Sequence, residues 1–389
     1  MRAPGSPASA GEQAGALGYL EASLASLAAN DLRRARVRHR DFVRDGVLAL
    51  TSNDYLGYAS GRTDYPSTDT RLPPPGAGAS RLVYGTTAEH DALEDALAAF
   101  LGTEDALLFS SGYAANLGLL SSLASPGDLV VSDRLNHASI IDGCRLARAT
   151  VSVVPHLDAA AVDRALTAFQ GPGRAFVVTE SYFSMDGDVP DLAALRAITH
   201  RHGAALLVDE AHAIGLFGAQ GRGLAHAAGV VPDAVVGTFG KCFGASGAFV
   251  AGSRSLVEWL WNRARSFVFS TGVSPRLADA ALTGLRRLQA DDDGRARVLG
   301  HAARLRRGLT ELGFAVPQES VGPIVPVMLG EASRTLAVSR ALAADGVRVI
   351  PIRPPTVPVG TSRLRVTVHA ALTETDVDRA LAAFAKVAP

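Results

Sequence analysis

The stretch AALLVDEAH, residues 204–212, decides the fold. Its apolar part, residues 204–208, shows no polar alternation, which is typical of a strand buried on both faces of a parallel sheet. Asp209 and His212 follow this part directly. An aspartate at such a strand end is costly to bury unless it meets a cation or hydrogen-bond donors, and capping of a helix is the simpler explanation. The stretch therefore predicts a buried strand with polar groups at its carboxyl end.

Six further apolar runs of the same kind lie on either side of this stretch. They cover residues 106–109, 129–131, 151–154, 176–178, 234–236 and 248–250, and helical patterns such as the one at 191–202 separate several of them. Strands that alternate with helices are typical of parallel sheets whose two faces are covered. The sequence therefore predicts an α/β fold with one large, mostly parallel sheet of seven strands.

The residues after the seventh run indicate a second, smaller domain. Ser274 and Pro275 begin a long helix, because a capping residue followed by proline is typical of a helix N-terminus. The apolar runs beyond it are fewer, and helical patterns separate them. These runs cover residues 324–329, 347–352 and 364–368, before a last helix at 374–386. We expect an N-terminal arm in residues 1–50, a large domain in 51–275 and a small α+β domain in 276–389.

Three segments before the first run are also predicted from their residues. Residues 16–44 are apolar early and then dense in arginine, which favours a helix. Residues 58–78 contain four prolines and are expected to form a loop, because proline interrupts regular elements. Residues 86–101 are expected to be helical, since Thr86 and Glu89 stand at capping-box spacing.

The composition excludes several classes of protein. Among 389 residues, 48% are hydrophobic, which is enough for a large core. Lys and Arg number 38 and Asp and Glu also 38, whereas proteins that grip nucleic acid normally carry a basic excess. Cys144 and Cys242 are too few for a disulfide framework or a structural zinc site, and no histidine pair has metal-ligand spacing. No apolar run is long enough to span a membrane, and the first residues resemble no signal peptide, so we expect a soluble cytoplasmic enzyme.

Several polar residues follow the predicted strands at their carboxyl ends, where ligands bind to open α/β sheets. Gly112 and Tyr113 open a helix after the first run, and their backbone N–H groups suit a phosphate, although an ordinary strand–helix turn has the same appearance. His137 follows the second run, where a structural role is the commoner one. Ser184 lies shortly after the fourth run.

Lys241 stands among glycines and phenylalanines after the run at 234–236. Such surroundings remove water from an amine and lower its pKa, as a Schiff-base lysine requires. A nucleotide P-loop does not fit, because position 235 is Val and the lysine precedes Cys242. Dinucleotide and serine-hydrolase motifs are also incomplete. A phosphate cradle, two histidines, an aspartate and a desolvated lysine on one sheet edge together predict a site for pyridoxal 5′-phosphate.

Four motifs carry a resemblance to a known family. They are the runs 51–57 (TSNDYLG), 183–188 (FSMDGD), 208–212 (VDEAH) and 238–241 (TFGK). In combination they resemble the α-oxoamine synthases, fold-type-I pyridoxal-phosphate enzymes that join an amino acid to an acyl thioester and release carbon dioxide. The resemblance covers the chain from about Leu32 onward and implies a homodimer with its site at the interface.

The resemblance also implies roles for single residues. It implies that Lys241 carries the cofactor, Asp209 pairs with its ring nitrogen and His137 stacks on its ring. The other implied cofactor contacts are Gly112, Tyr113 and Thr238 at the phosphate, Ser184 and His212 at the phenolic oxygen, and Thr271 at the partner's phosphate. The implied substrate contacts are Asn53 and Arg365 at the amino-acid carboxylate, Thr356 near the substrate and Arg33 near the acyl carrier.

Within the family, residues 352–358 (IRPPTVP) favour the branch that condenses L-alanine with a pimeloyl thioester in biotin biosynthesis. The sequence departs from the family at three places: Ala213 stands where the family usually has Gly, the Gly/Ser-rich segment is shortened to residues 76–81, and a proline-broken loop replaces a helix at 63–75. The region of this loop helps to shape the acyl side of the site in the family. Two other hypotheses remain. One is a sister synthase that uses glycine or serine with another acyl-CoA, and the other is a non-catalytic protein of the same fold.

Overall fold

The computed structural model describes residues 25–32, 46–56, 58 and 73–389. The helix predicted at 16–44 lies mostly outside the described residues, as does most of the loop predicted at 58–78. Arg33, predicted to contact the acyl carrier, also lies outside them. No helix among the described residues is long and apolar enough to cross a membrane.

A seven-stranded sheet forms the centre of the molecule, as predicted. Its strands are β2 (Asp105–Phe109), β3 (Leu129–Asp133), β4 (Thr150–Val154), β5 (Ala175–Glu180), β6 (Ala205–Asp209), β7 (Ala234–Thr238) and β8 (Ala248–Gly252). They lie in the order β2-β8-β7-β6-β5-β3-β4, and each of the seven apolar runs lies at one of them. Only β8 runs against its neighbours, and the other neighbouring pairs are parallel. The prediction of a mostly parallel sheet is therefore confirmed.

Helices cover both faces of this sheet, because successive residues of a strand point to opposite sides. Leu107 of β2 packs with α3 (Gly112–Leu123), α4 (Ala138–Ala147) and α8 (Arg254–Arg263) on one face. Leu108, the next residue, packs with α2 (Ala88–Leu101) and α10 (Pro275–Ala290) on the other. Further along that second face, α5 (Ala159–Ala168) and α6 (Leu192–Arg201) cover β3, β5 and β6. All of these strands except the edge strand β4, which is largely exposed, are buried on both sides, and this explains their lack of polar alternation.

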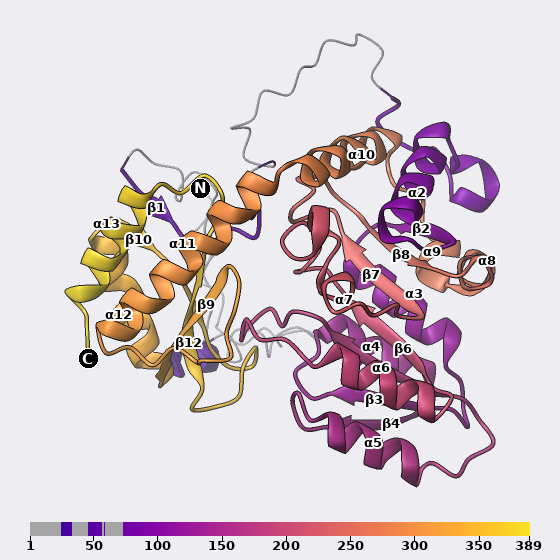
Figure 1. Ribbon diagram of the computed structural model, residues 1–389, viewed down its shortest axis with the longest axis horizontal. Helices are drawn as coiled ribbons and strands as arrows, with labels where there is room; N and C mark the ends of the chain where they lie inside the picture. Colours follow the sequence, from indigo (N-terminus) through magenta and orange to yellow (C-terminus); the bar gives the residue numbers. More distant parts are fainter. Residues whose placement is uncertain (1–24, 33–45, 57, 59–72) are drawn as a thin grey trace, which may run out of the picture.

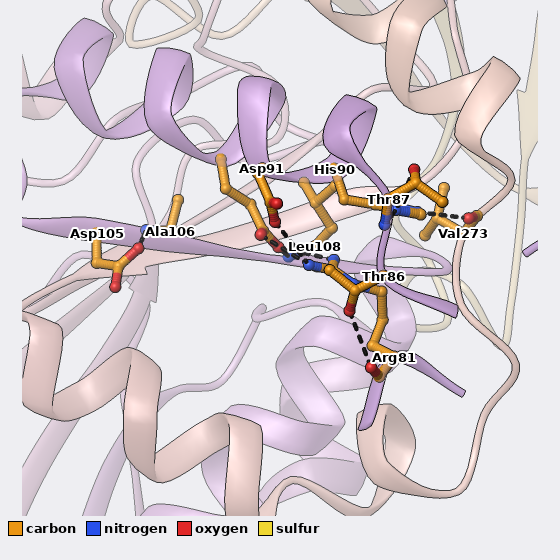
Figure 2. A network of polar contacts seen from close by, with 10 residues as sticks. Arg81, Thr86, Thr87, His90, Asp91, Asp105, Ala106, Leu108 and Val273 are labelled. Atoms are coloured by element: carbon orange, nitrogen blue, oxygen red, sulfur yellow. Dashed lines mark hydrogen bonds and ion pairs between the residues drawn. The ribbon is translucent and has the colours of Figure 1, made fainter. Parts of the chain in front are cut away.

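The N-terminus of α2 differs by one residue from the prediction. Thr87 precedes the helix and donates its backbone N–H to Nδ1 of His90, so this pair replaces the predicted pair Thr86 and Glu89. Thr86 is occupied elsewhere, because its hydroxyl donates to the Arg81 carbonyl oxygen and accepts from Arg81 Nε. Figure 2 shows this network between the segment of Arg81 and the first turn of α2.

A second group of elements follows α10 and α11 (Asp292–Glu311), and Figure 1 shows it beside the large sheet. Strands β11 (Ile350–Ile352), β12 (Ser362–Thr367) and β9 (Ile324–Gly330) form an antiparallel sheet in that order. Helices α12 (Ala332–Ala344) and α13 (Glu374–Ala385) belong to the same group.

The N-terminal segment contributes to this second group. Strand β1 (Leu48–Ala49) pairs in parallel with β10 (Val347–Arg348). Leu48 and Leu50 are buried in the core that β9 and β12 form with α11 and α13. The segment of β1 therefore packs with the C-terminal group of elements, although the large sheet follows it in the sequence. The boundaries predicted at residues 50 and 275 remain predictions.

Candidate functional site

A cavity of about 310 Å³ lies at the carboxyl ends of the parallel strands. Ten of the thirteen residues predicted from the sequence line it: Asn53, Gly112, Tyr113, His137, Ser184, Asp209, His212, Thr238, Lys241 and Arg365. Arg33 is outside the described residues, and the exposed residues Thr271 and Thr356 do not line the cavity. The fold thus gathers residues that are up to 312 positions apart in the chain.

Two neighbouring strands each place a carboxyl group at the floor of the cavity. Glu180 ends β5 and Asp209 ends β6, and the two residues are register partners in the sheet. Asp209 accepts a hydrogen bond of 2.7 Å from Nδ2 of Asn116 and one of 2.9 Å from the Ala211 backbone N–H. These donors satisfy the buried carboxylate and hold its charge in one place.

A chain of hydrogen bonds links Asp209 to His137. Asn116 also donates to Oγ of Ser139 at 3.0 Å, and that oxygen lies 2.8 Å from Nδ1 of His137. Because Nδ1 accepts the Ser139 backbone N–H at 3.3 Å, it carries no proton, so the ring proton of neutral His137 is on Nε2. Burial lowers the pKa of His137, which favours this neutral form. His137 therefore caps α4 and also lines the cavity. A structural role for this histidine is thus compatible with a role at the cofactor.

Burial lowers the pKa of Lys241 to about 8, although Asp209 and Glu180 both act in the opposite direction. An amine with such a pKa is present in part as the free base near neutral pH, the form that attacks a carbonyl group or accepts a proton from carbon. Removal of water from the amine is the effect that the sequence around Lys241 predicts.

The N-terminus of α3 lies at the cavity wall. Its capping residue Ser111 accepts the Ala114 N–H, which leaves Gly112 and Tyr113 to present the first N–H groups of the helix. A helix N-terminus of this kind favours an anion such as a phosphate. The Thr238 hydroxyl is engaged here, because it donates to the Gly247 carbonyl oxygen at 3.0 Å. To donate to a phosphate it must first break that hydrogen bond.

Arg365 reaches the cavity from β12 of the second sheet. Nε donates to the Ser184 carbonyl oxygen at 2.6 Å, and Nη1 donates to Oδ1 of Asn53 at 2.9 Å. Nη2 is buried and has no hydrogen-bond partner within the described ranges. Because Oδ1 of Asn53 is the acceptor, its amide NH₂ is a second donor group beside Nη2. This pair of donors suits a carboxylate.

His212 is held in the cavity wall by Tyr55. Nδ1 of His212 lies 2.8 Å from the Tyr55 hydroxyl, and both side chains are buried. Burial lowers the pKa of His212 well below its usual value, so the ring is neutral. If the tyrosine donates its proton to Nδ1, the ring proton lies on Nε2 and is available as a donor.

Four residues of the site were not predicted from the sequence: Tyr55, Asn116, Ser139 and Glu180. Asn116 and Ser139 are polar residues in helices, and each is buried. Asn116 lies four residues after Gly112, one helical turn away, and this spacing was the available signal. Glu180 is the last residue of β5, as Asp209 is of β6, but Thr179 separates it from the apolar run at 176–178.

The residues present fit pyridoxal 5′-phosphate. The fit rests on three features of the cavity: the desolvated amine of Lys241, the carboxylate of Asp209 fixed by two donors, and the helix N-terminus at Gly112. They match the aldehyde, the ring nitrogen and the phosphate of that cofactor. Among the residues that the structure describes, no group of three His, Cys, Asp or Glu side chains could hold a metal ion.

Comparisons with known proteins agree with the site. A family model described as aminotransferase class I and II matches residues 45–384. An 8-amino-7-oxononanoate synthase of Marinobacter nauticus is 46% identical over 87% of each chain. A serine palmitoyltransferase of Sphingomonas wittichii superposes with a TM-score of 0.87 at 31% identity, covering 97% of this chain and 100% of the other. A crystal structure of 8-amino-7-oxononanoate synthase from Francisella tularensis gives 0.74 at 26% identity, covering 88% and 98%.

Proposed function

The chain belongs to the aminotransferase class I and II family, and we propose that it condenses L-alanine with a pimeloyl thioester to give 8-amino-7-oxononanoate, carbon dioxide and the free thiol carrier. The reaction is a step of biotin biosynthesis. Like the sister reactions, this acyl transfer depends on pyridoxal 5′-phosphate. The 46% identity to a synthase of this kind is the observation that carries the proposal.

The cofactor, when bound, supplies an electron sink for charge that develops at the amino acid's α-carbon. Lys241 would hold it through its amine, and Asp209 would keep a proton on its ring nitrogen. Gly112 and Tyr113 would bind the phosphate through the N-terminus of α3. His137 would lie against the ring in the orientation that Ser139 fixes.

The amino-acid carboxylate would bind to Nη2 of Arg365 and to the amide of Asn53. These two groups fix the direction of the α-carbon's bonds, which decides which bond can release electrons into the ring. Nζ of Lys241 is the nearest candidate to take and return the α-proton, because its pKa of about 8 lets it do both near neutral pH.

A homodimer is also part of the proposal. Three apolar side chains near the segment of Thr271 are largely exposed, with relative exposures of 80% for Val83, 81% for Tyr84 and 72% for Phe269. Exposed apolar side chains of this size favour burial against a second chain. Thr271, two residues beyond Phe269, would then reach the partner's site, and sedimentation of the holoprotein tests the assembly. A cytoplasmic location is supported by the two cysteines, which are both free and buried.

A sister reaction with serine is the second candidate, because the serine palmitoyltransferase structure superposes more closely than the synthase structure does. Release of free thiol separates the candidates. The holoprotein is given alanine, glycine or serine in combination with pimeloyl, acetyl, succinyl and palmitoyl thioesters of coenzyme A, and with pimeloyl-acyl carrier protein. We expect the highest rate with alanine and a pimeloyl thioester, with Lys241→Ala as the inactive control.

A preference for glycine or serine in this panel would replace the proposal by a sister reaction. The absence of thiol release with every pair, together with no change of the cofactor's absorbance on addition of alanine, would favour a non-catalytic protein. The carrier, coenzyme A or acyl carrier protein, follows from the same rates.

A further inference from the structure

Glu180 is a buried carboxyl group in the cavity that the proposed roles leave unused. Its side chain is 4% exposed and lines the cavity at the end of β5. The backbone is fixed, because its N–H donates to Oδ1 of Asn136 at 3.2 Å and its carbonyl oxygen accepts from the Thr179 hydroxyl. Glu180 is therefore held at this place by the sheet and by its neighbours.

The two oxygens of the Glu180 carboxyl have different surroundings. The backbone N–H groups of His137 and Ser184 act on the carboxyl and oppose the rise of its pKa. Oε1, however, is buried without any hydrogen-bond partner in the part of the chain that the structure describes. A buried polar atom without a partner is costly, so a partner that arrives with a ligand is the simplest explanation for it.

The charges around Glu180 decide its protonation state. Its register partner Asp209 is a second carboxyl group directly beside it, and the like charges of two neighbouring carboxylates repel each other. Burial and this repulsion raise the pKa of Glu180 to about 8, against the opposing effect of Lys241. The other titratable groups that line the cavity are Tyr113, His137, His212 and the cation Arg365, and burial favours the neutral forms of the two histidines.

We propose that Glu180 acts as a neutral carboxylic acid whose Oε1 proton is donated to an oxygen atom of the bound cofactor. A carboxyl with a proton on one oxygen is a donor through that oxygen, and its other oxygen remains an acceptor. The resemblance implies that Ser184 contacts the phenolic oxygen of the cofactor, and the Ser184 backbone N–H acts on the Glu180 carboxyl, so the phenolic oxygen would be the acceptor. This role rests on the proposed function for the identity of the cofactor, but not for the choice of amino acid or thioester.

Three variants and a matched control test the proposal. Glu180→Gln keeps a neutral donor of the same shape, whereas Glu180→Ala removes it. Glu94→Gln is the control, because Glu94 is also a buried glutamate but pairs with Arg81 at 2.9 Å and does not line the cavity. Glu180→Asp keeps the carboxyl group but withdraws it by one methylene.

Two readouts do not depend on turnover. Infrared difference spectra of the wild type against Glu180→Gln at pH 7 should show one protonated carboxyl band, which is lost in the variant and retained in Glu94→Gln. The affinity for pyridoxal 5′-phosphate, measured by quenching of protein fluorescence, should be about tenfold or more higher for Glu180→Gln than for Glu180→Ala, with Glu180→Asp between them.

Two results would overturn the proposal. One is the absence of the protonated band at pH 7, which would mean an ionised Glu180 paired with Lys241. The other is a Glu180→Gln variant that binds the cofactor as poorly as Glu180→Ala, since a neutral donor would then not be what the cofactor requires. Neither readout involves alanine or a thioester, so failure of the thiol-release panel and failure of this proposal are distinguishable. If Glu180→Ala does not fold, the infrared band still decides.

Discussion

Arg365 and Asn53 form one recognition unit, in which Nη1 of the arginine donates to Oδ1 of the asparagine at 2.9 Å. The arginine lies in β12 of the second sheet, and the asparagine lies in the loop after β1, before the chain reaches the large sheet. The unit therefore joins the second sheet to the segment that leads to the large one. This hydrogen bond leaves Nη2 and the asparagine amide as donors toward the cavity. The orientation of each donor group therefore depends on the other residue.

Arg365→Lys should weaken the binding of L-alanine. The N–H bonds of a lysine side chain all belong to one nitrogen atom, whereas those of arginine are spread over three. A lysine therefore cannot donate at once to Asn53, to the Ser184 carbonyl oxygen and to a carboxylate. A lost hydrogen bond to a charged group is worth about 1.5–3 kcal/mol, so we expect the dissociation constant for alanine to rise about tenfold or more. Absorbance titration of the holoprotein with alanine measures this, and Arg340→Lys on the exposed face of α12 is the control. An unchanged titration curve would place the carboxylate elsewhere.

Replacement of Asn116 should weaken cofactor binding, because Asn116 orients both Asp209 and, through Ser139, His137. Asn116→Ala removes the 2.7 Å hydrogen bond to Asp209 and the link to Ser139, so the carboxylate and His137 both lose their fixed orientation. We expect the affinity for pyridoxal 5′-phosphate to fall by about tenfold. Asn116→Asp should be worse, because it puts a second carboxylate against Asp209. Ser122→Ala near the end of the same helix should have no effect, and equal affinities for all variants would show that Asn116 only fills space.

The local pattern of the chain was sufficient to predict the large sheet. Strands such as β6 are buried on both faces, so their residues are apolar throughout and polar groups stand out where the strand ends. Lys241 and Asp209 could be predicted for that reason. Strand β1 could not, because two residues carry no periodicity and their pairing with β10 joins positions about 300 residues apart.

The parts of the site that sequence patterns miss are those defined by packing. Asn116 and Ser139 look like ordinary helix residues in the sequence, and only the contact between α3 and α4 puts them in one chain of hydrogen bonds with Asp209. The capping pair of α2 was misplaced by one residue for a similar reason. Thr86 has the right type and spacing, but Arg81 already uses its hydroxyl.

His156 should make the protein's stability depend on pH in the alkaline range. Its ring nitrogens lie 2.9 Å from Asp133 and 3.0 Å from Asp188, and these aspartates raise the pKa of His156 to about 9 despite its burial. Since the unfolded value is near 6.5, the stabilisation is fully present below pH 6.5 and is lost as the pH rises through 9. His156→Asn should lower the free energy of unfolding by about 3–5 kcal/mol at pH 6.

The pH series separates this ion cluster from simple packing. Chemical unfolding of wild type and His156→Asn between pH 6 and pH 10 should give two curves that converge as the pH rises. A difference that stays constant over this range would mean that His156 contributes shape alone, through its edge-on contact with Phe183.

Arg81 and Glu94 form a buried ion pair. Replacement of one partner should destabilise the protein strongly, whereas replacement of both by apolar residues should be tolerated. Arg81 donates two hydrogen bonds of 2.9 Å to Glu94, and burial raises the pKa of Glu94 even so close to the guanidinium (Figure 2 shows Arg81 in this network). Arg81→Met leaves an unpaired buried carboxyl and should destabilise the protein by about 3–5 kcal/mol. The double variant Arg81→Met, Glu94→Leu should recover most of that loss, because no buried charge remains. Urea unfolding of the three variants measures the coupling, and additive losses would show that the pair does not act as a unit.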